Sequence, residues 1–539
     1  MDRRTLLRLL ASSAIGGREI VGHPFTGRLT RPAFAQSFTE SVATTTAGKW
    51  RGRVESGTHV FKGVRYGADT SSRRFLPPVA PQPWPGARDA LAFGAIAPQP
   101  SGGGRAISED CLHLNVWTPA LRDGAKRAVM VWFHGGAYSS GTSNEIETDG
   151  ARLSRRGDVV VVTVNHRLNA FGYLYLAELG GADLADSGNV GMLDLVLALQ
   201  WVRDNIPEFG GDPGNVTIFG HSGGGAKSAT LMAMPVAHGL FHRVATHSGQ
   251  QITASRTSTA TRNARALLTA LNLSDGHVND LRTLPMEQLV KVSRAPEYLG
   301  PVKDGRSLPR DPFEPDAPPL SASIPMILGN THDETRVLVG RGDPSLFSLT
   351  WETLQAKLEA NSPFMGPLNR GEVIAAYRNW HPEYTPVDVF FSATTDSRSW
   401  RGQVIEADRR AAQFAASKSA SAAAPTYVFQ FNWPTPIDGG KWKAHHGLDV
   451  PFIFDNAAIT PHMVGTGSDQ LRLSELMSRS WIAFAKTGNP NVTGLPEWPP
   501  FDLQRRATMV FDAATKVVDD PRGNERRLFG QVPYVQPGT

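Results

Sequence analysis

Short runs rich in Val, Ile and Phe recur along the chain, and longer segments with helical periodicity separate them. Between two of these runs, Leu193, Leu197 and Trp201 recur at four-residue spacing, which predicts a helix that packs on a sheet. Strands joined by crossover helices pair in parallel, because each helix returns the chain to the edge at which the next strand begins. The pattern therefore predicts an α/β fold with a mainly parallel sheet. Its predicted strands span 129–133, 159–164, 216–219, 324–328 and 427–431.

The whole chain is predicted to form one large folded unit. Of its 539 residues, 40% are apolar and 19% are charged, a balance that suits a large buried core. A late amphipathic helix is predicted from Leu473 to Phe484, with Gly488 at its end. No linker rich in Gly, Ser or Pro divides the sequence, so we expect a single domain over residues 36–539.

Charge and cysteine content exclude several classes of protein. Cys111 is the sole cysteine, which excludes an internal disulfide scaffold and a zinc site built from several thiolates. The first 35 residues carry six Arg against Asp2 and Glu19, which accounts for +4 of the net charge of +5. The remainder is nearly neutral, so nucleic acid is a poor candidate for a partner. No run approaches the roughly 20 consecutive apolar residues that a membrane span needs.

The N-terminus resembles a twin-arginine export signal. Arg3 and Arg4 precede a weakly apolar stretch, and the sequence Ala-Phe-Ala over residues 33–35 resembles a cleavage site before Gln36. We therefore predict that residues 1–35 are an export signal and that the mature protein is periplasmic or secreted. Charged residues interrupt the apolar stretch, so a polar tail on a cytoplasmic protein is the alternative.

A Gly-x-Ser-x-Gly motif over residues 220–224 directly follows one predicted strand and precedes a helical stretch that ends at Pro235. This context is typical of a nucleophile elbow, a tight turn that presents the serine hydroxyl at the carboxyl end of the sheet. The flanking glycines permit the close backbone approach and the strained dihedral angles that such a turn requires. The alternative is a glycine-rich turn with an idle serine. We predict that Ser222 is the nucleophile.

A second loop that contains glycines, residues 134–138, follows the predicted strand 129–133. Hydrolases with a nucleophile elbow place oxyanion-hole donors in such a loop. We therefore predict that the backbone N–H groups of Gly136, Ala137 and Gly223 stabilise the negative oxygen of a tetrahedral intermediate. Each donor of this kind contributes about 3 to 4 kcal/mol to stabilisation of the transition state.

A serine hydroxyl needs a base to take its proton, and the base needs a carboxylate to hold its tautomer. Asp333 and Glu334 follow the fourth predicted strand, and His445 and His446 follow the fifth. The resulting chain order of serine, acid and histidine is that of α/β-hydrolases. Position alone does not decide between the two members of either pair.

Several long segments resemble the type B carboxylesterase and cholinesterase family of α/β-hydrolases, in particular its bacterial members similar to para-nitrobenzyl esterase. The resemblance covers about residues 57–490 and implies an α/β-hydrolase fold, with helices on both faces of the sheet and helical insertions. It implies that the acid is Glu334, which ends an Asp-Glu pair, and that the base is His446, which opens a His-Gly-x-acid stretch. The matching segments include 61–66 (FKGVRY), 109–119 (EDCLHLNVWTP), 132–138 (WFHGGAY), 165–174 (NHRLNAFGYL), 188–224, 329–335 (GNTHDET), 446–454 (HGLDVPFIF) and 485–490 (AKTGNP).

The resemblance implies a serine hydrolase that cleaves carboxylic esters of small molecules through an acyl-enzyme, with no cofactor and no metal site. An amidase or carbamate hydrolase with the same triad is the alternative, because the acyl chemistry is shared. A non-catalytic binding module is a further alternative, and the retention of all three triad residues argues against it. The sequence leaves open the acyl and alcohol groups of the ester and the oligomeric state.

The resemblance also bears on residues around the site. Glu109 and Arg167 are expected to form an ion pair, and Cys111 is expected to be a buried, unreactive thiol. The motif has His221 where relatives usually have Glu, and Gly223 where they usually have Ala. We therefore expect the electrostatics beside the nucleophile, and the shape of the acyl side, to differ from the family pattern.

If residues 1–35 are removed on export, the mature protein from the native host begins near Gln36, because the small-residue pattern ends there. Mass spectrometry of the N-terminal peptide measures this directly. Exported protein that still begins at Met1 or Asp2 would contradict the predicted signal.

Overall fold

A computed structural model describes residues 40–361, 363–417 and 422–536, and the predicted export signal lies outside these ranges. The main sheet has 13 strands in the order β1-β2-β3-β5-β7-β6-β8-β9-β12-β13-β14-β15, with β4 paired to β2. All pairings from β7 to β14 are parallel, and the outer ones are antiparallel except that of β2 with β4. The strands are β1 (Glu40–Thr44), β2 (Lys49–Glu55), β3 (Thr58–Arg65), β4 (Ala87–Asp89), β5 (His113–Thr118), β6 (Arg127–Phe133), β7 (Val160–Val164), β8 (Gly211–His221), β9 (Arg243–His247), β12 (Met326–Thr331), β13 (Thr426–Phe431), β14 (Ala507–Phe511) and β15 (Lys516–Asp519), and β10 (Ser255–Arg256) and β11 (Val302–Lys303) form a separate parallel pair.

The five predicted strands correspond to β6, β7, β8, β12 and β13, which confirms the mainly parallel sheet. Each strand differs from its predicted bounds at one end or both, most clearly β12 and β8. The strand β12 begins after Pro325, because proline has no N–H to donate to the ladder. The strand β8 begins at Gly211, ahead of the apolar run that signalled it.

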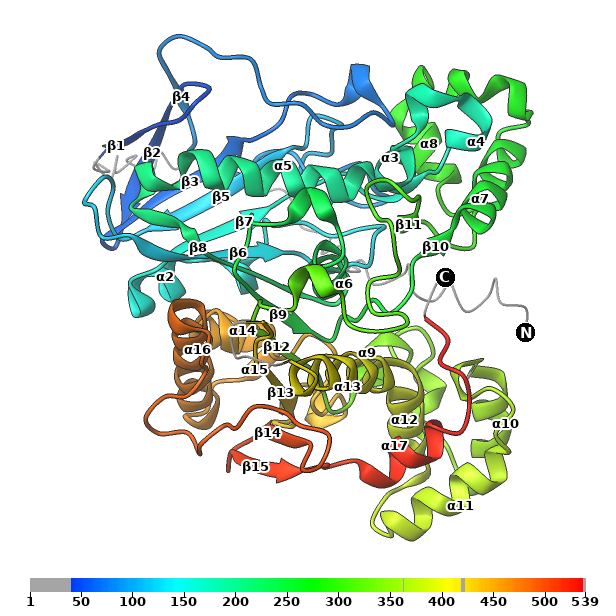
Figure 1. Cartoon of the computed structure of the whole chain (residues 1–539). Coiled ribbons are helices and arrows are strands. Elements are labelled where there is room, and N and C mark those ends of the chain that lie inside the picture. Colours follow the sequence, from blue (N-terminus) through cyan, green and yellow to red (C-terminus); the bar gives the residue numbers. More distant parts are fainter. Residues whose placement is uncertain (1–39, 362, 418–421, 537–539) are drawn as a thin grey trace, which may run out of the picture.

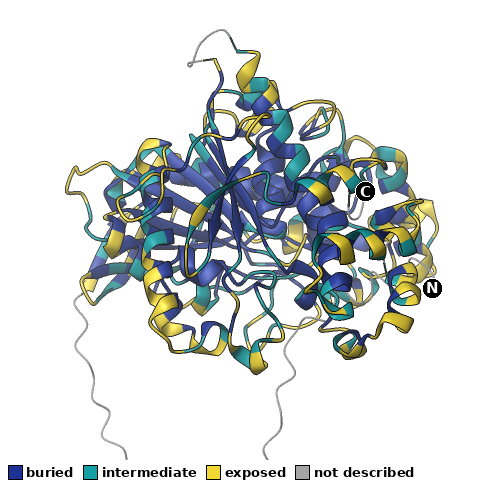
Figure 2. Cartoon of the chain, turned by 90° about the horizontal axis from the view of Figure 1, so that it is seen from below, coloured by how far each residue is buried: buried dark blue, intermediate teal, exposed yellow. Residues whose placement is uncertain are grey.

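Side chains alternate between two cores along the parallel strands. In β6, Val129 and Val131 pack in one core with α5 and α6, whereas Met130 and Trp132 pack in the other with α2 and α16. Figure 1 shows α5 on one side of the sheet and α16 on the other, and Figure 2 shows the strands at the centre of the molecule mostly in the colour of buried residues. Helices on both faces are therefore confirmed. These helices are α2 (Ala151–Gly157), α5 (Val190–Asn205), α6 (Gly223–Leu231), α13 (Arg401–Ala415), α14 (Val450–Ile453), α15 (Pro461–Val464) and α16 (Asp469–Thr487), the last ending at Gly488 as predicted.

Two further groups of helices each have a hydrophobic core of their own, and they lie at the upper right and the lower right of Figure 1. They are the helical insertions that the family resemblance implies. One group comprises α3 (Asn169–Tyr173), α4 (Ala177–Gly180), α7 (Thr257–Ala270) and α8 (Met286–Val292), and the other comprises α10 (Trp351–Asn361), α11 (Arg370–Trp380), α12 (Pro386–Thr395) and α17 (Gly523–Phe529).

Among the described helices, none combines the length and the apolar character that a bilayer span requires.

The expected ion pair between Glu109 and Arg167 is wrong. Glu109 pairs with Arg74, and Arg167 pairs with Asp194 of α5, at 2.6 Å between Nη2 and Oδ1. Each of these buried charges needs an opposite charge in contact, and the order of residues in the sequence does not reveal which one the fold brings nearest. Cys111 is buried as expected, and burial raises the pKa of its thiol.

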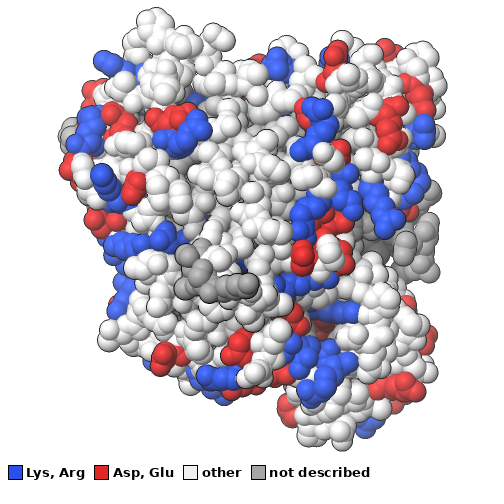
Figure 3. Space-filling model, viewed as in Figure 1, with Lys and Arg blue, Asp and Glu red and all other residues white. Residues whose placement is uncertain are grey.

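Surface charges are arranged differently from the buried ones. On the face shown in Figure 3, side chains of both signs surround a broad uncharged area. Arg505 and Asp519 form an exposed pair at 3.2 Å, with 56% and 51% of their side chains accessible. Water and salt screen such a pair, so it contributes little to stability, whereas the loss of one partner from a buried pair leaves an uncompensated charge.

Asp194→Asn is expected to lower the free energy of unfolding by about 3 to 5 kcal/mol, because it leaves the Arg167 guanidinium buried without a counter-charge. Asp519→Asn, the same change in the exposed pair, is expected to lower it far less, because water and salt screen that pair. Chemical denaturation of the two variants gives both values. Equal losses of stability would contradict the role assigned to burial.

Candidate active site

Ser222 lies in the turn between β8 and α6, with φ 56° and ψ −125°. A positive φ is strained for a residue that has a Cβ, so the surrounding structure must fix it. The backbone N–H of Ser222 donates to the carbonyl of His247, the last residue of β9, at 2.7 Å. The turn therefore has the strand-to-helix geometry that the Gly-x-Ser-x-Gly motif predicts.

Three glycines let other backbone segments approach this turn. A Cβ on Gly224 would lie 1.9 Å from the carbonyl oxygen of Phe133, and one on Gly220 would lie 2.4 Å from the carbonyl carbon of Gly224. A Cβ on Gly249 would lie 1.9 Å from the carbonyl oxygen of Ser222. The first two glycines belong to the motif, whereas Gly249 follows β9 and carries no local signal in the sequence.

A carboxylate and an imidazole are in contact in this region. Glu334 is the first residue of α9 (Glu334–Leu338), shortly after β12, and its side chain is fully buried. Its Oε2 accepts a hydrogen bond from His446 Nδ1, and its Oε1 accepts hydrogen bonds from the hydroxyl and the backbone N–H of Thr331, both at 2.9 Å. With Nδ1 engaged in this way, the His446 ring retains Nε2 as its proton acceptor.

Glu334 is ionised at neutral pH in spite of its burial. Burial by itself raises its pKa, but the charge and hydrogen bond of His446 and the hydroxyl of Ser248 outweigh burial and lower the pKa to about 2. Sequence reasoning missed both hydroxyl donors. Thr331 stands three residues before Glu334, a spacing typical of a capping box, and this signal could have found it. Ser248 follows β9 and has no comparable signal.

Asp333 and His445 make other contacts. The two oxygens of Asp333 accept hydrogen bonds from His332 Nδ1 at 3.0 Å and from Arg336 Nε at 3.2 Å. The Nδ1 of His445 donates to the carbonyl of His446 at 3.0 Å. Neither side chain takes part in the contact between Glu334 and His446.

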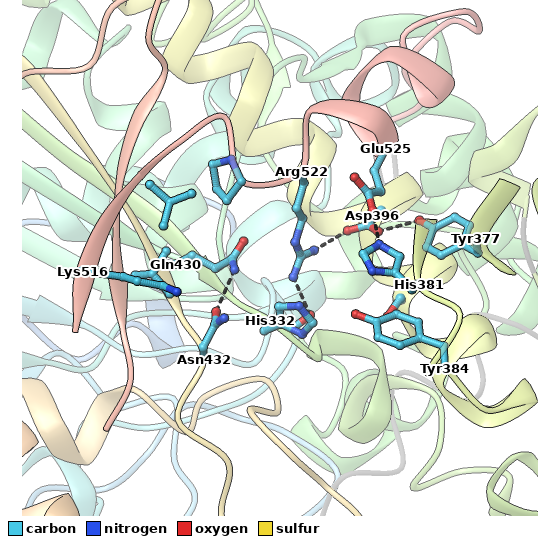
Figure 4. A pocket seen from close by; sticks show the side chains of 14 residues that line it. His332, Tyr377, His381, Tyr384, Asp396, Gln430, Asn432, Lys516, Arg522 and Glu525 are labelled. Carbon is cyan, nitrogen blue, oxygen red and sulfur yellow. Dashed lines mark hydrogen bonds and ion pairs between the residues drawn. The ribbon is translucent and has the colours of Figure 1, made fainter. Parts of the chain in front are cut away.

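His332 also lines a cavity of about 210 Å³, which Figure 4 shows from close by. Two pairs of its titratable side chains are in contact with each other, Arg522 with Asp396 and His381 with Glu525. Ser222 and His446 are not among the residues that line it. The cavity is therefore separate from the candidate active site.

The loop predicted to carry oxyanion-hole donors packs against the turn at Ser222. A Cβ on Gly223 would lie 2.1 Å from the carbonyl oxygen of Ala137. Gly136 and Ala137 have φ values of 88° and 53°, and no described residue accepts a hydrogen bond from either backbone N–H. Gly223 is the first residue of α6, a position whose N–H has no acceptor within the helix. Among the described residues, these three N–H groups therefore have no hydrogen-bond acceptor.

His221 lies beside His446, with the two ring centroids 4.3 Å apart. Burial, followed by the charge of His446, lowers the pKa of His221 to about 3. The ring is therefore neutral at neutral pH. A neutral imidazole therefore occupies the position at which relatives usually have a glutamate.

Comparisons with known proteins agree over nearly the whole chain. The sequence model of the carboxylesterase family matches residues 39–529. The chain is similar to a para-nitrobenzyl esterase of Bacillus subtilis, with 34% identity over 512 residues that cover 91% of this chain and 99% of the relative. It is also similar to a phenmedipham hydrolase of Pseudarthrobacter oxydans, with 32% identity, covering 89% of this chain and 97% of the relative. The crystal structure of Geobacillus stearothermophilus carboxylesterase EST55 at pH 6.2 matches with a TM-score of 0.80 and 37% identity, covering 90% of this chain and 99% of that one.

Proposed function

This chain belongs to the carboxylesterase family and is a carboxylic ester hydrolase, and from that premise we propose that it acts through an acyl-enzyme on Ser222. In this proposal His446 is the base, and Glu334 is the carboxylate that orients it. The contact between Glu334 and His446 Nδ1 carries the proposal. It supports a base whose Nε2 is available to a serine held at positive φ in the adjoining turn.

Acylation begins when the Oγ of Ser222 attacks the ester carbonyl carbon and its proton passes to Nε2 of His446. The Glu334 carboxylate stabilises the imidazolium that forms. The N–H groups of Gly136, Ala137 and Gly223 donate to the oxyanion of the tetrahedral intermediate, each contributing about 3 to 4 kcal/mol. Collapse of the intermediate expels the alcohol, which takes the proton from Nε2.

Deacylation repeats these steps with water as the nucleophile. Nε2 of His446 accepts a proton from water as the water oxygen attacks the acyl carbon on Ser222. The same N–H groups stabilise the second oxyanion. The carboxylic acid then leaves, and the proton on His446 returns to Oγ, which restores the free enzyme.

Ser222→Ala is expected to lower kcat on the order of 10⁴- to 10⁶-fold, because the variant lacks the hydroxyl that forms the acyl-enzyme. The thermal midpoint is expected to change little, since a single hydroxyl contributes little to packing. Turnover of p-nitrophenyl esters of graded acyl length and thermal denaturation measure the two effects. A variant with close to full activity would exclude Ser222 as the nucleophile.

Glu334→Gln is expected to lower kcat by on the order of 10³- to 10⁴-fold, because an amide cannot stabilise the imidazolium and favours the wrong tautomer. Asp333→Asn provides the matched control at the adjacent buried carboxylate, which contacts His332 and Arg336 instead. It is expected to lower kcat less than about tenfold, since it touches no reacting group. If Asp333→Asn proves the more damaging change in folded protein, Glu334 is the wrong carboxylate.

A further inference from the structure

Lys227, on α6, is a basic side chain that is completely buried and forms no ion pair with any described Asp or Glu. Burial lowers its pKa to about 7. A buried ammonium without a counter-charge is costly, so the groups that its Nζ contacts are of interest. Both hydrogen-bond acceptors are backbone carbonyls of the loop that packs on Ser222.

These two carbonyls lie at either end of that loop. The Nζ of Lys227 donates to the carbonyl of Ala137 at 2.8 Å and to the carbonyl of His134 at 3.2 Å. The same Nζ lies 5.4 Å from the ring centroid of Tyr138, the next residue in the loop. One side chain of the helix that follows Ser222 therefore holds both ends of residues 134–137.

The carbonyls between these ends are also held. The Gly135 carbonyl accepts a hydrogen bond from His134 Nδ1 at 2.8 Å, and the Gly136 carbonyl accepts from the backbone N–H groups of Ser139 and Ser140 at 3.2 and 3.0 Å. A peptide unit is planar, so a fixed carbonyl turns the following N–H to the opposite side. The N–H of Gly136 is consequently turned away from His134 Nδ1, and that of Ala137 is turned away from the N–H groups of Ser139 and Ser140.

The loop needs such support because it is strained. Ala137 has a φ of 53°, which a residue with a Cβ adopts only when its surroundings require it. Its carbonyl oxygen is confined between the Cα of Gly223, where a Cβ would lie at 2.1 Å, and the Nζ of Lys227. Without the Nζ, one side of this confinement is lost and the carbonyl is left without its donor.

We propose that Lys227 is a positioning residue for the oxyanion loop, residues 134–137. Its hydrogen bonds to the carbonyls of His134 and Ala137 anchor the two peptide units that flank those carrying the N–H groups of Gly136 and Ala137, and so hold these N–H groups in place for the substrate oxygen. Lys227 itself touches no reacting atom. The inference rests on the proposed function, since it assigns Lys227 to stabilisation of the oxyanion in that mechanism.

Lys227→Met tests this role, because methionine has similar length and no donor. We expect kcat for a p-nitrophenyl ester to fall about 10- to 100-fold while KM changes less than about threefold, since the lost interaction acts in the transition state. Affinity for an alkyl trifluoromethyl ketone should fall by a similar factor. This probe forms a bond from Ser222 Oγ to its carbonyl carbon, passes the serine proton to His446 and leaves an oxyanion in the hole.

Arg410→Met is the matched control. Arg410 on α13 is also a buried basic side chain, and it donates to the carbonyls of Ser321 and Ile324 at 3.0 and 2.6 Å. These carbonyls lie near the amino end of β12 and not beside Ser222. The Arg410→Met substitution should lower the thermal midpoint without changing kcat or ketone affinity. Lys227→Gln, which keeps an N–H donor, should recover part of the lost kcat. Lys227→Leu, which also lacks a donor, provides the test if Lys227→Met does not fold.

A folded Lys227→Met with unchanged kcat and ketone affinity would overturn the inference, as would equal kinetic losses in Arg410→Met. Unchanged kcat and ketone affinity in folded Lys227→Leu would overturn it as well, as would a loss of kcat in Lys227→Gln equal to that in Lys227→Met, because a retained donor would then make no difference. Failure of the proposed function itself is distinguishable, because Ser222→Ala would then retain activity and the ketone would not add to Ser222 in the wild-type enzyme.

Discussion

The left-handed conformation of Ser222 constrains everything built around it. A φ of 56° at a residue with a Cβ persists only if neighbouring backbone segments pack against the turn without space for further side chains. The segments after β6 and β9 meet that requirement through Gly224 and Gly249, at positions where a Cβ would lie 1.9 Å from a carbonyl oxygen. The same packing brings the oxyanion loop into contact with the turn at Ser222. The strain at Ser222 and the fixed positions of the loop's N–H donors therefore have a common origin.

The parallel core explains how distant residues reach this turn. Ser222 follows β8, Glu334 follows β12, and His446 lies beyond β13, and the carboxyl ends of parallel strands meet at one edge of a sheet. Burial at that edge would neutralise an isolated carboxylate. The hydrogen bonds and the charge that Glu334 receives there lower its pKa instead, and so provide the anion that an imidazolium needs.

The strands, the late helix and the elbow could be predicted because each depends on local sequence: apolar runs, a helical period, and glycines beside a serine. The resemblance then favoured Glu334 over its neighbour, a choice that periodicity and spacing left open. Buried charges were harder to predict. The predicted ion-pair partner of Glu109 is wrong, and no sequence pattern indicated the contacts of Lys227. Tertiary packing brings the partners of a buried charge together from remote parts of the chain.

The acyl-enzyme on Ser222 is tested most directly by quenching the enzyme in acid during turnover of p-nitrophenyl acetate and mapping the acetylated peptide by mass spectrometry. We expect one acetyl group on the peptide that contains Ser222, formed at the rate of the p-nitrophenol burst, and no acetylation in Ser222→Ala. Steady turnover with an acetyl group on another residue at that rate, or with no covalent adduct under conditions in which the burst is observed, would contradict it.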